Sequence, residues 1–323
     1  MSSTAGISQM RAAMFRDGAW AMRWAWRLTF AAAAFDAVAM ALSGFTLPPA
    51  GGAMSLGCAG AVYAIAWFYR HVRPDEILSA LAESASLLIA FTLILAVASY
   101  LVTAADMPLH DADYAAFDRL IGFDWMGHQR FIATRPLLAN ALQSAYELSI
   151  PLVALAVLSL ALTRNLERLG VFILLFVITA IITIALSGLV PAAGAYVYYQ
   201  PGNDIVAAIH DPHVGQWHLR HFLALRDGTM RVIPLPFVEG LITFPSFHTQ
   251  LAVITAWALL GVRYAGGAGL VVNGAVIFST LGIGGHHLTD VIVGGLIALG
   301  AIAAVTGRRA LAPQPRMAAP LAA

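Results

Sequence analysis

Eight stretches of about twenty mostly apolar residues constrain this chain more than any other feature. A helix of that length crosses the roughly 30 Å of hydrocarbon in a bilayer. Of the 323 residues, 60% are hydrophobic and 11% are charged, against about a quarter charged in a soluble domain. The sequence therefore predicts an all-α membrane protein with about eight transmembrane helices, near residues 25–46, 52–69, 79–104, 137–163, 169–190, 247–265, 268–284 and 287–306.

The arginines predict how these helices are oriented. The sequence has no lysine, and most arginines lie before the first span or after the second, fourth, sixth and eighth spans. With eight spans these positions share one side, which the positive-inside rule makes cytoplasmic. We therefore expect a protein of the cytoplasmic membrane with both termini inside. The residues that carry this argument are Arg11, Arg16, Arg23, Arg27, Arg70, Arg73, Arg164, Arg168, Arg263, Arg308, Arg309 and Arg316.

Two short motifs lie on the other, outer side. One is Phe244-Pro-Ser-Phe-His248 at the start of the sixth span, and the other is His286-His-Leu-Thr-Asp290 at the start of the eighth. The outer segments 105–136 and 191–246 are too polar to span a membrane. We expect residues 107–131 to include an interfacial helix and residues 191–246 to cover the two motifs.

The motifs contain the groups that metal-free phosphoryl transfer requires: a nucleophile, an acid and an anion-binding site. If the last span begins near His286, Asp290 lies one turn further on the same face and can accept the Nδ1 proton, so that Nε2 is free to attack phosphorus. His248 can then protonate the leaving oxygen. Ser246 and the free amides of a helix start suit a bound phosphate. A histidine four residues before an aspartate also occurs by chance near membrane interfaces, and only the combination of both motifs favours catalysis.

The order of these motifs resembles that of the type 2 phosphatidic acid phosphatase superfamily of membrane phosphatases and phosphotransferases. Within it, Thr243-Phe-Pro-Ser-Phe-His-Thr249 and Gly285-His-His-Leu-Thr-Asp290 are similar to the inositol-phosphorylceramide-synthase-like branch. The resemblance implies a six-helix-type core, which we place at residues 105–310, after N-terminal transmembrane helices in residues 1–104 and before a disordered tail in 311–323. It also implies His286 as nucleophile, Asp290 as its orienting carboxylate and His248 as acid, acting on a lipid or isoprenoid phosphate.

The sequence departs from the superfamily pattern at its cationic positions. The arginine expected six residues before the motif histidine is Thr280, and the lysine before Arg135-Pro136 is His128. Arg226 and Arg231, just upstream of the first motif, are the candidate phosphate-binding replacements. Alternatively, both arginines belong to a solvated loop and do not bind phosphate.

Other functions receive less support. His210, His213, His218 and His221 lack a nearby cysteine or acidic ligand, so we expect neither a metal nor a cofactor. A net charge of +1 gives no reason to expect nucleic acid. A proton-coupled transporter that uses Asp36, Glu83, Glu147 and Asp290 is the alternative function, although no two related halves are visible. The sequence does not decide between hydrolysis and transfer to an alcohol, and it does not set the oligomeric state.

Overall fold

The computed structural model describes residues 19–209, 214–235 and 237–310, and over these ranges the chain is all-α without a sheet. This confirms the predicted fold class. The long apolar helices are α2 (Ala19–Ser43), α3 (Pro49–His71), α4 (Glu76–Thr103), α9 (Leu166–Leu189) and α15 (Leu288–Ala310). Four further apolar helices are α7 (Pro136–Glu147), α8 (Ser149–Leu162), α13 (Phe247–Leu259) and α14 (Gly266–Gly282). The short helices are α5 (Asp111–Leu120), α6 (Trp125–Ala133), α10 (Ala195–Tyr199), α11 (Asn203–Ala208) and α12 (Leu219–Arg226).

In the described part of the chain, five helices are long and apolar enough to cross a membrane, and α7 with α8 makes a sixth if the bent pair is one span. The pair replaces the straight helix expected over 137–163 and bends by 50°. The bend lies beside Pro151, which cannot donate a backbone hydrogen bond to the preceding turn. Helices α13 and α14 have 13 and 17 residues, or about 20 and 25 Å at 1.5 Å per residue. The number of eight spans therefore stays a prediction.

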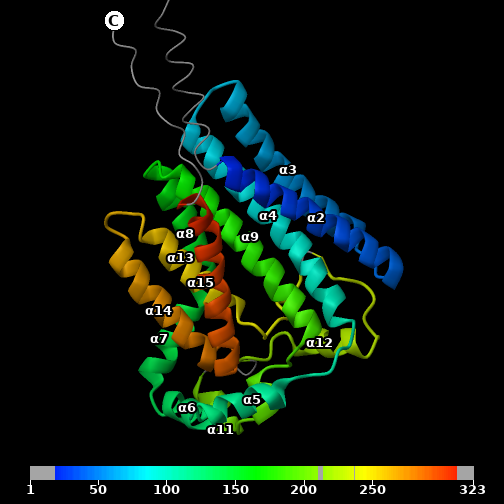
Figure 1. Cartoon of the computed structure of the whole chain (residues 1–323). Helices are drawn as coiled ribbons and strands as arrows, with labels where there is room; N and C mark the ends of the chain where they lie inside the picture. Colours follow the sequence, from blue (N-terminus) through cyan, green and yellow to red (C-terminus); the bar gives the residue numbers. More distant parts are fainter. Residues whose placement is uncertain (1–18, 210–213, 236, 311–323) are drawn as a thin grey trace, which may run out of the picture.

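Helix α9 is the centre of the bundle (Figure 1). It packs against α2, α4, α8, α13 and α15, and residues around its whole circumference are buried, among them Phe172, Leu175 and Thr179. A helix that is apolar all round is stable only inside such a bundle. Leu87 and Phe91 of α4 belong to the same hydrophobic core as residues of α9 and α13, so α4 is packed as part of the core bundle.

The short helices α5, α6, α11 and α12 lie together at one end of the bundle (Figure 1). The start of α2 and the end of α15 lie at the opposite end, where Trp20 and Trp24 share a pocket with Ala304 and Val305. The expectations for Arg11, Arg16, Arg316, the tail 311–323, His210 and His213 lie outside the described residues.

Several arginines of the orientation argument lie at the end opposite the short helices. Arg70 pairs with Glu83, and Arg164 lies 3.5 Å from Glu76. Arg168 donates to backbone carbonyls at the end of α13. These residues share one end of the bundle, as the positive-inside argument requires, while the side of the membrane that this end faces stays a prediction.

Helices α13 and α15 are in close contact at Gly294. A Cβ at this position would lie 2.5 Å from the carbonyl oxygen of Ser246. The Ser246 N–H also donates to the carbonyl of Asp290 at 3.0 Å. The glycine therefore lets the two motif-bearing helix starts lie side by side.

We predict that Gly294→Ala destabilises the protein by about 1–3 kcal/mol, because the added methyl group overpacks this contact. Gly295→Ala is the matched control, since a Cβ there has no atom within 4 Å. Thermal unfolding in detergent measures both variants. Equal melting temperatures for the two variants would show that the close approach is not needed.

Candidate active site

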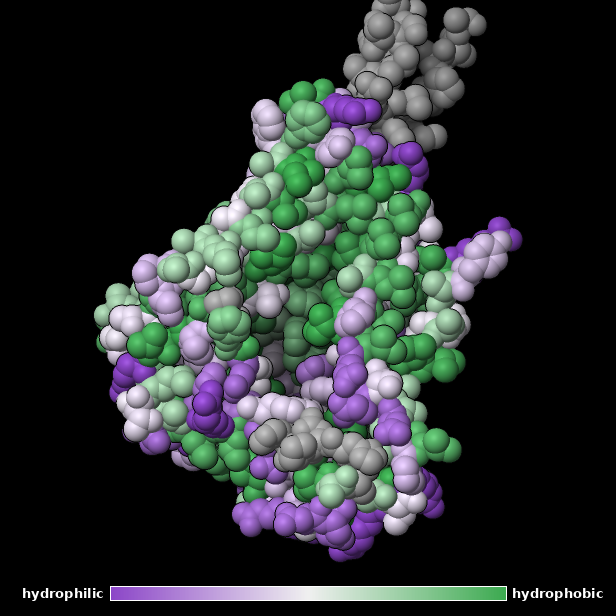
Figure 2. Space-filling model, turned by 180° about the vertical axis from the view of Figure 1, so that it is seen from behind, coloured by the Kyte–Doolittle hydropathy of each residue, from purple (hydrophilic) through white to green (hydrophobic). Residues whose placement is uncertain are grey.

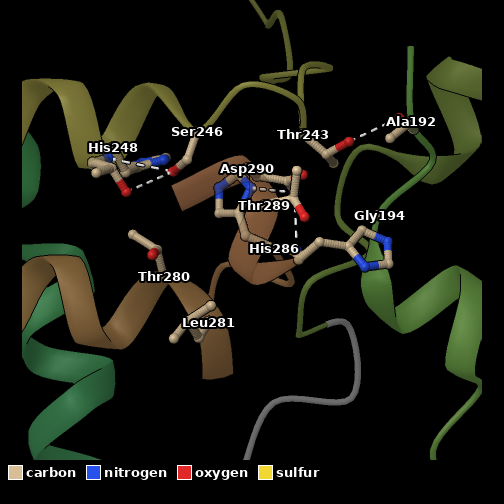
Figure 3. A network of polar contacts seen from close by, with 12 residues as sticks. Ala192, Gly194, Thr243, Ser246, His248, Thr280, Leu281, His286, Thr289 and Asp290 are labelled. Carbon is tan, nitrogen blue, oxygen red and sulfur yellow. Dashed lines mark hydrogen bonds and ion pairs between the residues drawn. The ribbon is translucent and has the colours of Figure 1, made fainter. Parts of the chain in front are cut away.

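Two histidines from separate motifs line one cavity of about 320 Å³. His248 is the second residue of α13, and His286 lies two residues before α15 begins. Figure 3 shows both side chains with Ser246, Thr280 and Asp290, which come from the ends of α13, α14 and α15. The structure thus brings together motifs that are about forty residues apart in the sequence.

His286 and Asp290 form the contact that the sequence predicts. His286 Nδ1 lies 3.3 Å from Asp290 Oδ2, and the two side chains are 3% and 0% exposed. The backbone N–H of His287 donates to the same carboxylate oxygen at 2.9 Å. Because the carboxylate is held by a backbone donor, it fixes the imidazole with Nδ1 towards Asp290.

His248 is oriented by a residue that the sequence analysis did not select. Tyr146 of α7 places its hydroxyl 3.3 Å from His248 Nδ1, and the two rings lie 4.5 Å apart. A hydrogen bond at Nδ1 leaves Nε2 as the nitrogen available for proton transfer. Tyr146 also lines the cavity.

Ser246 is the N-cap of α13. Its hydroxyl accepts hydrogen bonds from the backbone N–H and the hydroxyl of Thr249, at 3.3 and 3.1 Å, and the residue is fully buried. It is not among the described residues that line the cavity. The geometry therefore gives Ser246 a capping role, and its contact with phosphate stays a prediction.

Arg226 and Arg231 lie away from the described lining of the cavity. The Arg226 guanidinium is 2.7 Å from Asp106 Oδ1 and donates to the Met107 carbonyl. The Arg231 guanidinium lies over the ring of Phe45, 5.2 Å from its centroid. Thr280, at the position of the missing arginine, is buried and donates to the carbonyl of Ile277. A phosphate-binding role for either arginine stays a prediction.

The second histidine of the doublet is part of a network that the sequence analysis missed. His287 is fully buried, with Nε2 3.4 Å from Asp111 Oδ1 and Nδ1 3.7 Å from Asp118 Oδ2. Asp118 also accepts from the backbone N–H groups of Leu288 and Thr289, at 2.9 and 2.8 Å. The carboxylate therefore caps the first turn of α15, where a negative charge is favoured.

Asp111 links the same network to the outer segment. Its two carboxylate oxygens accept from the backbone N–H groups of Ala193 and Gly194, at 2.9 and 2.8 Å. Asp111 and Asp118 are seven residues apart and so lie on one face of α5. This spacing is the sequence signal for the network. The expected interfacial helix exists, but this face of it points inward.

The buried charges of this network shift one another's pKa values. Burial alone lowers the pKa of His287, but the hydrogen bond with Asp111 and the ion pair with Asp118 outweigh it and raise the pKa to about 9. Burial tends to raise the pKa of Asp118, but the ion pair with His287 and the hydrogen bonds from Leu288 and Thr289 lower it below its usual range. His287 is therefore a cation at neutral pH, and Asp118 is an anion.

Two of the four histidines considered as metal ligands have separate partners. His218 lines the cavity and lies 3.0 Å from the carbonyl of Ala193, and burial lowers its pKa. His221 faces Tyr100 and Glu239. Within the described ranges no three side chains of His, Cys, Asp or Glu are grouped as metal ligands. The absence of a metal stays a prediction.

The sequence shows which family the chain belongs to. A sequence model of the PAP2 superfamily matches residues 112–304, which include both motifs and all of α5 except its first residue, Asp111. The chain belongs to the PAP2 superfamily. This membership implies a membrane phosphatase-type hydrolase, and it suggests lipid phosphates as substrates. No curated protein and no solved structure matches the chain.

The His287 network predicts a pH dependence of stability. Because the folded-state pKa of His287 is above the value of 6.5 for a free histidine, the stabilisation is complete below pH 6.5 and is lost as the pH rises towards 9. We expect the melting temperature of the PAP2 protein to fall over this range. In Asp118→Asn, which removes one of the paired carboxylates, the fall between pH 6.5 and 9 should be smaller. A wild-type melting temperature that stays constant over this range would contradict a cationic His287.

Proposed function

We propose that this protein is a lipid-phosphate phosphatase or phosphotransferase that works without a metal through a phosphohistidine. The observation that carries the proposal is that His248 and His286 line one cavity while Asp290 holds the Nδ1 side of His286. Nucleophile, orienting carboxylate and acid are thus present in one place.

The reaction takes two steps. His286 Nε2 attacks phosphorus and the bond between phosphorus and the leaving oxygen breaks. His248, which takes up a proton when the negatively charged phosphate binds beside it, transfers that proton to the leaving oxygen. Neutral His248 then takes a proton from water or an alcohol, whose oxygen attacks the phosphohistidine and frees His286. Asp290 keeps its negative charge throughout and stabilises the imidazolium that forms at His286. Water as acceptor gives hydrolysis, and an alcohol gives transfer.

The phosphate is stabilised mainly at the start of α13. The Thr249 N–H is already taken by the Ser246 hydroxyl, so the N–H groups of Phe247 and His248, two residues that line the cavity, are the ones available to an anion. The start of α15 contributes less than its position suggests, because Asp118 already occupies its amides. Ser246, Arg226 and Arg231 remain our candidates for further phosphate contacts.

Lipid or isoprenoid phosphates are supported as substrates by the apolar side of the cavity. Leu95 and Ala96 of α4 and Ala180 and Ile184 of α9 line it, whereas the histidines lie at its polar end. The space-filling view shows a hollow where the hydrophobic surface of the helices meets the hydrophilic end of the molecule (Figure 2). A molecule with a phosphate at one end and a hydrocarbon chain at the other fits this arrangement.

The topology is part of the same proposal. We place the protein in the cytoplasmic membrane with both termini inside and the cavity at the outer surface, and α13 and α14 complete eight spans. The core comprises residues 105–310 together with the packed α4. The motif Pro-Ser-Phe-His favours the inositol-phosphorylceramide-synthase-like branch.

The transporter hypothesis gains no support from the positions of its carboxylates. Glu83 pairs with Arg70, and Glu147 accepts from Gln143. Asp36 lies on α2, while Asp290 contacts His286. They do not form a connected proton path.

We predict that purified protein in detergent with EDTA releases phosphate from phosphatidate or a prenyl diphosphate. His286→Ala should lower the rate by about 10³-fold or more, and His248→Ala by about 10²–10⁴-fold, as expected for loss of a nucleophile and of a general acid. His71→Ala is the matched control, because this exposed histidine contacts the carbonyl and the ring of Trp67 within its own helix. Full activity in His286→Ala would remove the proposed nucleophile.

We also predict that Ala96→Phe narrows the apolar side of the cavity. The rate for a long-chain lipid phosphate should fall about tenfold, while that for a short, water-soluble phosphate ester should stay the same. Ala303→Phe on the exposed face of α15 is the control for the added ring. Equal loss for both substrates would argue against a chain-binding role for α4.

A further inference from the structure

The cavity that holds the two histidines also contains a carboxylate. Glu239 lines it, with a side chain that is 32% exposed. Among the described lining residues, Glu239 is the one acidic side chain, and none is lysine or arginine. A carboxylate repels a phosphate in the same cavity, so it needs a reason to be there.

Glu239 is held in place by two contacts, and a third contact joins its two partners. Its backbone N–H donates to the hydroxyl of Tyr100 at 3.1 Å, and its Oε2 lies 3.2 Å from His221 Nδ1. The same Nδ1 lies 2.8 Å from the Tyr100 hydroxyl. Tyr100 and His221 are 0% and 5% exposed, so the two side chains that hold Glu239 are themselves packed in the protein interior.

The carboxylate nevertheless keeps unused acceptor positions. Arg220 Nη2 lies 3.3 Å from His221 Nε2, and an arginine can only donate, so Nε2 accepts and the ring proton is on Nδ1. That single proton faces two acceptors, the Tyr100 hydroxyl and Glu239 Oε2. A carboxylate has about four acceptor sites, and at most one of them is used here.

We infer that Glu239 forms a subsite for a hydroxyl-bearing group, which accepts hydrogen bonds from that group while the phosphate lies between His248 and His286. The inference rests on the proposed function and deepens it. The hydroxyl belongs either to the headgroup of a phosphodiester or to the alcohol that accepts the phosphoryl group. In both cases Glu239 recognises the part of the reactants that phosphatidate lacks.

Binding tests the inference directly in the full-length protein with His286→Ala, where the proposed turnover is blocked. The probes are phosphatidylglycerol, phosphatidate, and phosphatidate with glycerol. Their binding is measured by tryptophan fluorescence and by the shift of the melting temperature. Glu239→Gln should weaken binding of phosphatidylglycerol, or of glycerol in the third mixture, by about 10- to 100-fold, the usual range for a hydrogen bond to a charged group. Binding of phosphatidate alone should be unchanged or tighter.

The measurements with phosphatidylglycerol and with glycerol distinguish the two sources of the hydroxyl. An effect on phosphatidylglycerol alone assigns the subsite to the headgroup, and an effect on glycerol alone assigns it to the acceptor. Glu239→Asp, which keeps the charge, should recover part of the lost affinity. Glu76→Gln, at the opposite end of the bundle, is the matched control.

Equal changes for phosphatidate and the hydroxyl-bearing probes, or no change for any of them, would overturn the inference. The melting temperature of Glu239→Gln without any probe shows whether that variant is folded. If it is not folded, probe binding by Glu239→Asp is compared with that of the parent protein, and this comparison decides the role of Glu239. Failure of the proposed function would instead show as no product from any lipid phosphate with the wild-type protein. The binding arms would still decide the role of Glu239.

Discussion

The arrangement of the site depends on how the first turn of α15 is held. Asp118 accepts hydrogen bonds from the amides of Leu288 and Thr289, and His287 lies between Asp118 and Asp111 in a buried cluster. A buried cation between two carboxylates is stable because each charge has a partner, and removal of one partner leaves the others uncompensated. The cluster thereby ties the short helix α5 to the residue next to His286. It also ties α5 to the loop at Ala193 and Gly194, which lies beside His218 of the cavity.

The second constraint is the close contact between α13 and α15. The Ser246 N–H donates to the carbonyl of Asp290, and Gly294 lets α15 pass the carbonyl of Ser246. His248 and His286 therefore come to line one cavity without any direct bond between them. Their hydrogen bonds at Nδ1 go to Tyr146 and Asp290, so each ring is oriented by a neighbour outside the pair. A polar end and an apolar side of the cavity then meet where a lipid substrate would change from phosphate to hydrocarbon.

The sequence was sufficient for the fold class and for the contact between His286 and Asp290, because apolar length and helical spacing are local properties. It was not sufficient for the length of α13. The apolar run continues past Leu259, but the helix ends there, and the following turn places Gly261 against Arg168. Tyr146 and Glu239 were missed because their roles arise from contacts across the bundle. Asp118 lies in the segment expected to include an interfacial helix, and nothing local shows that its face of α5 turns towards α15. The same limitation explains Arg226, which was selected for its distance from the motif in sequence and lies instead against Asp106.

The most direct test of the account is the detection of the covalent intermediate. Protein mixed with a lipid phosphate and quenched in alkaline detergent within milliseconds to seconds should carry a phosphoryl group on His286, identified by mass spectrometry of the peptide that contains it. The same signal should be absent in His286→Ala. Turnover of the substrate with a phosphoryl group on another residue, or with no modified residue at any time point under conditions that preserve phosphohistidine, would contradict the assignment of His286 as nucleophile.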